Sequence, residues 1–289
     1  MIDALRISTA SPPIEETLQG HAVSHREVSV PGHQGADVIV SIFSPLGHGD
    51  LRPGIVHLHG GGMFMGDRFT GVDVLIDWVE RFQAVGISVE YRLAPEHRAP
   101  TQVEDAYAAL TWVADRAPDL GIDPSRLIVS GASAGGGLAA GVALLARDRR
   151  GPALFGQVLM YPMLDDRNET VSSHQVNGEG LFDRTSNQTG WNAVLGAESG
   201  SSGVSMYVAP ARAPFLGALP PALIEVGSVD VFRDENVAYA SQIWADGGVA
   251  ELHVWPGGFH AFDGAAPQSA LARAMIGTRT AWLGRLLEA

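Results

Sequence analysis

The segment RLIVSGASAGGGLAAGVALLA, residues 126–146, decides the fold of this chain. It opens with a short apolar run ending at Ser130, which predicts a buried strand. From Ala134 it continues with small and apolar residues that predict a buried helix. The junction contains G-x-S-x-G centred on Ser133. A serine exposed at so sharp a turn needs small neighbours, because strand and helix approach closely there. Taken alone, the motif is also compatible with a plain glycine-rich turn.

Short apolar strands alternate with longer helices on both sides of this segment. We predict strands at 25–30, 37–43, 54–59, 86–90, 126–130, 155–161, 222–226 and 251–255, and helices at 72–82, 101–114, 134–146, 235–246 and 267–287. A short helix is expected after Pro12-Pro13. The alternation indicates an α/β fold, with a mostly parallel sheet covered by helices on both faces. A polar, Gly/Ser-rich stretch at 174–203 interrupts it, and we interpret this as an insertion within a single domain, 1–289.

Composition excludes several classes of function. The 289 residues include 19 Lys and Arg against 32 Asp and Glu, and the net charge of −13 argues against nucleic-acid binding. The chain has no Cys, which excludes disulfides, thiolate zinc sites, iron–sulfur clusters and a cysteine nucleophile. No signal-peptide pattern is visible at the N-terminus. The apolar window 127–146 is about long enough to span a bilayer, but its glycines and serines favour a buried strand and helix. We therefore expect a soluble cytoplasmic protein without a membrane span.

A run of glycines follows an early strand, in the sequence HLHGGGM from His57 to Met63. Such a run lets backbone N–H groups point at a developing oxyanion with no side chain in the way. A phosphate-binding loop is the alternative, but neither G-x-x-x-x-G-K-[ST] nor G-x-G-x-x-G is present. His57 and His59 also have the spacing of a metal-binding pair on a strand. No nearby carboxylate completes such a site, so we expect no metal and no cofactor.

The two remaining members of a catalytic triad are predicted in loops that follow later strands. The strand at 222–226 leads into Asp230, and the strand at 251–255 leads into His260. With Ser133 they give the chain order serine, acid, histidine that is typical of this strand-to-helix serine motif. Asp234 is the alternative acid, but we expect it to form a structural ion pair with Arg233 or another residue.

Together these motifs resemble the bacterial hormone-sensitive-lipase-type esterases (family IV) of the α/β-hydrolase fold. The resemblance extends from about Arg26 to the C-terminus. It rests on His59-Gly-Gly-Gly62, Tyr91-Arg-Leu-Ala-Pro-Glu96, Gly131-Ala-Ser-Ala-Gly135, Tyr161-Pro-Met-Leu-Asp165, Leu219-Pro-Pro221, Gly227-Ser-Val-Asp-Val-Phe-Arg-Asp-Glu235 and Gly257-Gly-Phe-His-Ala-Phe262.

The resemblance implies a role for each of these blocks. Ser133 would be the nucleophile, His260 the base and Asp230 the acid that orients it. The oxyanion donors would be the backbone N–H groups of Gly61, Gly62 and Ala134. It further implies that His59 orders the loop, that the Tyr91–Glu96 block is a structural brace, and that a small helical cap forms from about 1–20 and 174–203.

The resulting hypothesis is serine-dependent hydrolysis of carboxylic esters through an acyl-enzyme on Ser133. The small cap suggests short to medium acyl chains in a small-molecule ester, and Met63, Phe64, Phe182 and Trp191 are candidate pocket walls. A specialised acyltransferase, lactonase or amidase would use the same triad. A non-catalytic small-molecule receptor, such as the plant gibberellin receptor that is similar to this family, is a further alternative. A homodimer through an edge strand is also expected from the resemblance.

Overall fold

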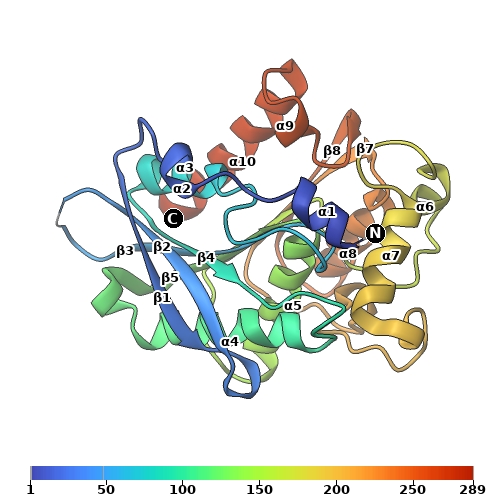
Figure 1. The fold of residues 1–289 in the computed structure, drawn as a ribbon, viewed down its shortest axis with the longest axis horizontal. Coiled ribbons are helices and arrows are strands. Elements are labelled where there is room, and N and C mark those ends of the chain that lie inside the picture. Colours follow the sequence, from blue (N-terminus) through green and yellow to red (C-terminus); the bar gives the residue numbers. More distant parts are fainter. Residues whose placement is uncertain (1, 48, 289) are drawn as a thin grey trace.

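A computed structural model describes residues 2–47 and 49–288. Within them one sheet has the strand order β1-β2-β4-β3-β5-β6-β7-β8, and it crosses the centre of the molecule in Figure 1. The strands are β1 (Val23–Pro31), β2 (Asp37–Pro45), β3 (Arg52–Leu58), β4 (Val85–Glu90), β5 (Ile122–Ala132), β6 (Gly156–Met160), β7 (Ala222–Val229) and β8 (Ala250–Phe259). The β1–β2 and β2–β4 pairs are antiparallel, whereas β3 to β8 run parallel. The mostly parallel sheet predicted from the sequence is confirmed.

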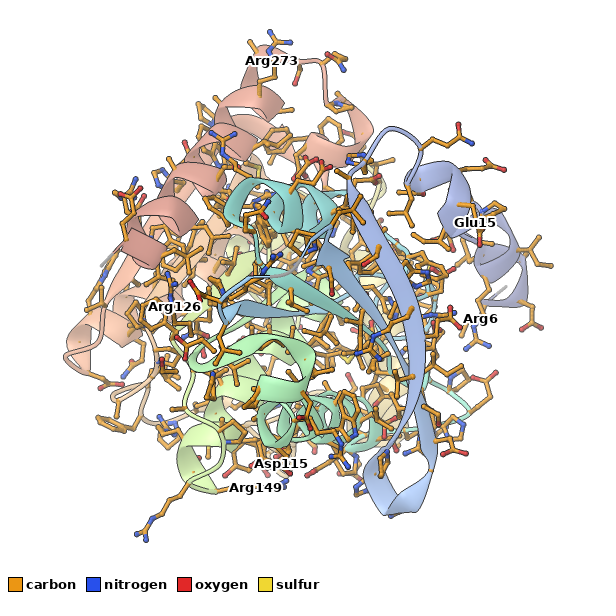
Figure 2. The ribbon with its side chains drawn as sticks, turned by 90° about the vertical axis from the view of Figure 1, so that its left-hand side faces the viewer. Arg6, Glu15, Asp115, Arg126, Arg149 and Arg273 are labelled. Atoms are coloured by element: carbon orange, nitrogen blue, oxygen red, sulfur yellow. The ribbon has the colours of Figure 1, made fainter. Side chains whose placement is uncertain are left out.

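Helices cover both faces of the sheet, because side chains alternate between the faces along each strand. Along β5, Ile128 packs in one buried cluster with α3 (Asp73–Phe82) and α10 (Ala270–Glu288). Its neighbour Val129 packs in a second cluster with helices on the opposite face. Those helices are α4 (Thr101–Asp115), α5 (Ala134–Asp148) and α8 (Arg233–Ala245). Figures 1 and 2 show α3 and α10 on one side of the sheet, with α4 on the other.

The decisive segment divides into strand β5 and helix α5, as predicted. Helix α5 lies almost directly on β3, since a Cβ atom placed on Gly135 would collide with the carbonyl oxygen of Leu58. The small residues of this segment therefore serve close helix–strand packing. No helix of the described residues is both long and apolar enough to cross a membrane.

The N-terminal segment and the insertion are helical. Their helices are α1 (Ile2–Ser8), α2 (Ile14–Thr17), α6 (Val171–Gln175) and α7 (Arg184–Leu195), and 3₁₀ turns lie at η1 (His33–Gly35), η2 (Pro118–Leu120), η3 (Gly196–Glu198) and η4 (Pro210–Arg212). The final helix is shorter than predicted. It begins at Ala270, and a separate short helix, α9 (Phe262–Ala265), precedes it. Ala261, with a φ of 56°, turns the chain between β8 and α9.

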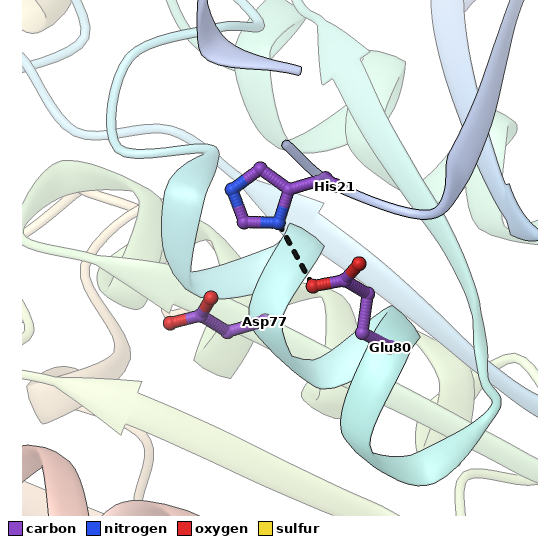
Figure 3. A group of neighbouring side chains, drawn as sticks. All are labelled: His21, Asp77 and Glu80. Carbon is purple, nitrogen blue, oxygen red and sulfur yellow. Dashed lines mark hydrogen bonds and ion pairs between the residues drawn. The ribbon is translucent and has the colours of Figure 1, made fainter. Parts of the chain in front are cut away.

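An ion pair anchors the chain leading into β1 onto helix α3. Figure 3 shows the ring of His21 beside Asp77 and Glu80, which lie one turn apart on α3. Nδ1 of His21 lies 2.8 Å from one carboxylate oxygen of Glu80, and Ala22 N donates to the other at 2.6 Å. Both oxygens of Glu80 thus already have partners. These contacts anchor the segment that leads into β1, and we assign no metal to the cluster.

Candidate active site

Ser133 occupies a strained turn between β5 and α5. Its backbone has φ 58° and ψ −120°, a region that costs a non-glycine residue about 1–3 kcal/mol. Two hydrogen bonds hold it there. Ser133 N donates to the Met160 carbonyl at 2.8 Å, and Met163 N donates to the Ser133 carbonyl at 2.9 Å. This conformation points the hydroxyl away from the sheet edge, toward the loops that follow β7 and β8.

Ser133, His260 and Asp230 form one chain of hydrogen bonds. The Ser133 Oγ lies 2.9 Å from Nε2 of His260, and Nδ1 of the same ring lies 2.9 Å from Oδ2 of Asp230. The other carboxylate oxygen of Asp230 accepts from Phe232 N at 2.9 Å. Asp230 is fully buried. This arrangement fixes the imidazole tautomer, with the proton on Nδ1 and the lone pair of Nε2 facing the serine hydroxyl.

Three aromatic rings surround the imidazole of His260. The ring centroids of Tyr161, Phe232 and Phe182 lie 5.0, 5.1 and 5.3 Å from it. The first two approach edge-on, an arrangement that aromatic pairs favour. With these rings around it, His260 is buried together with Asp230.

The glycine run after β3 lies against the Ser133 turn. A Cβ atom on Gly60 would be 3.5 Å from that of Ser133. Gly61 and Gly62 have φ of +114° and +60°, and a side chain on Gly61 would collide with the Met65 carbonyl. Among the described residues, neither Gly61 N nor Gly62 N donates a hydrogen bond. The N–H of Ala134 is in the first turn of α5, where amides have no intrahelical acceptor. The geometry therefore leaves all three predicted donors available to an anion.

Comparison with known proteins agrees with this geometry. Residues 55–264 match the family profile described as the alpha/beta hydrolase fold. Over 281 residues the chain is 34% identical to carboxylesterase NlhH of Mycobacterium tuberculosis, covering 96% of this chain and 86% of the relative. The chain belongs to the hormone-sensitive-lipase-type α/β hydrolases.

Solved structures agree over almost the whole chain of this α/β hydrolase. A bacterial heroin esterase superposes with a TM-score of 0.91 at 35% identity, covering 99% of this chain and 90% of its own. The thermostable carboxylesterase EstE1, cloned from a metagenomic library, superposes with a TM-score of 0.88 at 31% identity, covering 99% and 98%. The predicted family and fold are thereby confirmed.

His59 and His57 of the hydrolase are neutral structural residues. Nδ1 of His59 donates to the Gly60 carbonyl at 2.8 Å, and its ring stacks on Tyr91 at 4.1 Å. Tyr91 in turn donates its hydroxyl proton to the His59 carbonyl at 2.8 Å. Nδ1 of His57 lies 2.9 Å from Ser130 Oγ. Burial lowers the pKa of His59 and lowers that of His57 to about 3.

All four candidate pocket residues of the hydrolase are buried. Of these, Phe182 packs against the His260 ring. Helix α7, which carries Trp191, rests on the glycine loop. A Cβ atom on Gly190 would be 3.1 Å from the Gly62 carbonyl and 3.5 Å from the Phe64 ring. The insertion therefore approaches the loop that bears the predicted oxyanion donors.

Asp234, the alternative acid, is committed elsewhere. One of its oxygens pairs with Nε of Arg233 at 2.7 Å, and the other accepts from Ser172 N at 2.7 Å. It therefore anchors α6 to α8, in agreement with the ion pair predicted for it.

Sequence reasoning missed a buried ion cluster behind the triad of the hydrolase. Arg279 of α10 is 2% exposed and donates to Glu225 at 2.7 Å and to Asp263 at 2.9 Å. Glu225 is on β7, which leads to Asp230, and Asp263 follows His260 by three residues. Burial raises the pKa of Glu225. The visible signal was the single charge in the apolar strand ALIEV at residues 222–226.

Glu235, in the first turn of α8, is a second buried carboxyl that was missed. It accepts from Leu164 N at 2.7 Å and from Asp165 N at 3.3 Å. Burial raises its pKa well above the ordinary value. Glu235 thus holds the segment after β6 in place next to the turn that carries Asp230.

Proposed function

We propose that Ser133, His260 and Asp230 catalyse hydrolysis of carboxylic esters through an acyl-enzyme. The chain is a carboxylic-ester hydrolase of the hormone-sensitive-lipase type, in line with relatives named carboxylesterase. The observation that carries the residue assignment is the unbroken series of hydrogen bonds from Ser133 Oγ through His260 to Asp230. It joins a nucleophile, a base and an orienting acid in one line.

In the first half-reaction, His260 Nε2 takes the hydroxyl proton as Ser133 Oγ attacks the ester carbonyl carbon. The oxyanion that forms accepts hydrogen bonds from Gly61 N, Gly62 N and Ala134 N. The tetrahedral intermediate then expels the alkoxide, which takes the proton from His260 and leaves as the alcohol. In the second half-reaction, His260 deprotonates water, which attacks the acyl-enzyme, and the carboxylic acid is released with return of the proton to Ser133. Asp230 stabilises the imidazolium in both halves.

We further propose that about 1–20 and 174–203, which include α1, α2 and α7, form a cap, and that the acyl chain is short to medium. The close approach of α7 at Gly190 to the Gly62 carbonyl supports this, because it limits the space above the glycine loop. Met63, Phe64, Phe182 and Trp191 are the proposed walls. A series of p-nitrophenyl esters from acetate to palmitate tests the preference, and a maximum at long chains would contradict it.

The catalytic assignment is tested with Ser133→Ala. We expect turnover of p-nitrophenyl butyrate to fall by about 10³-fold or more, with an unchanged circular dichroism spectrum. A fluorophosphonate probe should label a peptide containing Ser133 in the unaltered enzyme and no peptide in the variant. Turnover close to that of the unaltered enzyme, or labelling of another serine, would refute the assignment.

We also propose a homodimer through β8. Within the described residues β8 pairs with β7 alone, so its second edge is open to another strand. Exposed apolar side chains lie on or beside it, at Val249, Val254 and Trp244. Light scattering coupled to gel filtration should give twice the chain mass for the unaltered protein and the monomer mass for Val254→Lys. A monomer at about 50 µM unaltered protein would contradict the dimer.

A further inference from the structure

Arg6, on the N-terminal helix α1, joins three segments that are distant in sequence. Its Nε donates to the Phe64 carbonyl at 2.7 Å, and one terminal nitrogen donates to the Ala94 carbonyl at 2.7 Å. Both terminal nitrogens donate to the two carboxylate oxygens of Glu96, each at 2.8 Å. Figure 2 shows Arg6 on α1 at the side of the molecule beside the sheet. One guanidinium thus holds two backbone carbonyls and one carboxylate in a fixed geometry.

The first of these carbonyls belongs to the glycine loop. Phe64 N and Met65 N both donate to the Gly61 carbonyl, at 3.1 and 3.0 Å, so Phe64 is part of the turn that shapes Gly61 and Gly62. The Ala94 segment also holds this turn, since Ala94 N donates to the Met63 carbonyl at 2.9 Å. Arg6 therefore fastens the far end of the glycine loop to the Tyr91–Glu96 block.

Tyr91 fastens the near end of the same loop. It stacks on His59 and donates to the His59 carbonyl. The Tyr91–Glu96 block, to which no catalytic role was assigned from the sequence, thus supports the glycine loop at both ends. Arg6 adds side-chain hydrogen bonds to this arrangement from outside both the block and the loop.

Stability alone is a poor explanation for so many contacts at Arg6. Glu96 is 54% exposed, and ion pairs in such positions add little to the free energy of folding. Helix α1 has no fully buried residue, although Ile2 and Leu5 pack against the main hydrophobic cluster. The hydrogen bond from Arg6 lowers the pKa of Glu96 to about 2, so the Glu96 carboxylate is charged at neutral pH. A contact of small energetic value that joins three separate segments fits a positioning role.

We propose that Arg6 is a positioning residue for the oxyanion loop, so that one side chain of the N-terminal helix affects catalysis. The inference rests on the proposed role of Gly61 and Gly62 as oxyanion donors. Glycine backbones are the most flexible in the chain, and donors stabilise an oxyanion only when their positions are fixed beforehand. Without the guanidinium, the Phe64 carbonyl turns toward water and the Gly61 and Gly62 amides lose their fixed direction. Both half-reactions pass through a tetrahedral intermediate, so both slow down.

The test compares Arg6→Ala and Arg6→Lys with Ser8→Ala, an exposed change on the same helix whose hydroxyl donates to the Leu5 carbonyl. The measurements are kcat and KM for p-nitrophenyl butyrate, the Ki of an arylboronic acid, and the Tm. A boronic acid forms a tetrahedral anion on the serine, so its affinity reports on the oxyanion donors directly. Loss of an entire donor costs about 10²–10³-fold in kcat.

Since Arg6→Ala misdirects donors without removing them, we expect kcat to fall about 10-fold and Ki to rise by a similar factor. The KM should stay within about twofold and the Tm within about 2 °C. Arg6→Lys should recover part of the lost kcat, and Ser8→Ala should resemble the unaltered enzyme. An unchanged kcat and Ki, a rise in KM alone, or an equal effect of Ser8→Ala would overturn the inference. If the unaltered enzyme fails to bind the boronic acid, the proposed catalytic function itself is wrong, which separates the two failures.

Discussion

Replacement of Arg279 by Met should destabilise the protein in a strongly pH-dependent way. The substitution keeps the apolar stem within the core but leaves Glu225 and Asp263 without their buried partner. Breaking a buried ion pair in this way costs about 3–5 kcal/mol. Protonation of the unpaired carboxylate limits this loss of folding free energy. Neutralising a glutamate costs about 1.4 kcal/mol per pH unit above its ordinary value near 4.3, which is about 5 kcal/mol at pH 8 but under about 2 kcal/mol at pH 5.5.

The sign of the pH dependence follows from proton binding. Without Arg279, burial holds the pKa of Glu225 in the folded chain still further above that in the unfolded chain. The folded state then binds more protons, so stability falls as pH rises through the interval between the two values. We expect a loss of about 4 kcal/mol at pH 8 and about 2 kcal/mol at pH 5.5. Urea unfolding followed by tryptophan fluorescence at both pH values measures the difference.

Arg285→Met is the matched control, because Arg285 is also on α10 and also pairs with a strand glutamate. That pair is exposed, at 58% for Arg285 and 36% for Glu251, and should be worth under about 1 kcal/mol at either pH. Equal losses for the two variants would refute the reasoning. So would a loss for Arg279→Met that is the same at pH 5.5 and pH 8.

Three further predictions concern the active site and the helix beneath it. Asp230→Ala should lower kcat/KM for p-nitrophenyl butyrate by about 10⁴-fold, whereas Asp234→Ala should lower it by less than about tenfold. A reversed ranking of the two variants would show that the acid is wrongly assigned. Gly135→Ala should lower the free energy of unfolding in urea by about 3 kcal/mol or more, because the new Cβ meets the rigid Leu58 carbonyl. The control Gly277→Ala, in open space on α10, should be neutral or stabilising, and comparable effects of the two variants would contradict this packing argument. Gly190→Val should lower kcat/KM more for p-nitrophenyl octanoate than for p-nitrophenyl acetate, since the new side chain would press on the Gly62 carbonyl and the Phe64 ring. An unchanged ratio of the two kcat/KM values would exclude this part of α7 from the pocket.

The central strands and main helices could be predicted because their apolar residues follow a buried face. The segment 126–146 is the clearest case, since its apolar run and its small residues both follow from the contact of β5 and α5 with β3. The positions of Ser133, Asp230 and His260 were predictable from a general property of parallel sheets, in which the loops after the strands meet at one edge. Their hydrogen bonds bring together residues up to 127 apart in the chain.

Arg6 and Arg279 could not be predicted, for opposite reasons. Helix α1 is short and has no fully buried residue, so its apolar pattern is weak, and the contacts of Arg6 depend on carbonyls whose positions only the folded chain defines. Arg279 is in a helix whose charged residues look like a solvated face, yet its side chain is fully buried. The separate helix α9 was missed because it depends on the backbone turn at Ala261.

The buried cluster around Arg279 also bears on the order in which the protein is made. Ser133, Asp230 and His260 all leave the ribosome before α10, and chains begin to fold from the N-terminus during synthesis. Until α10 emerges, Glu225 and Asp263 have no cation to neutralise them, so β7 and the turn after His260 lack their buried partner. Every reacting group therefore precedes, along the chain, the helix that supplies the buried cation behind the site.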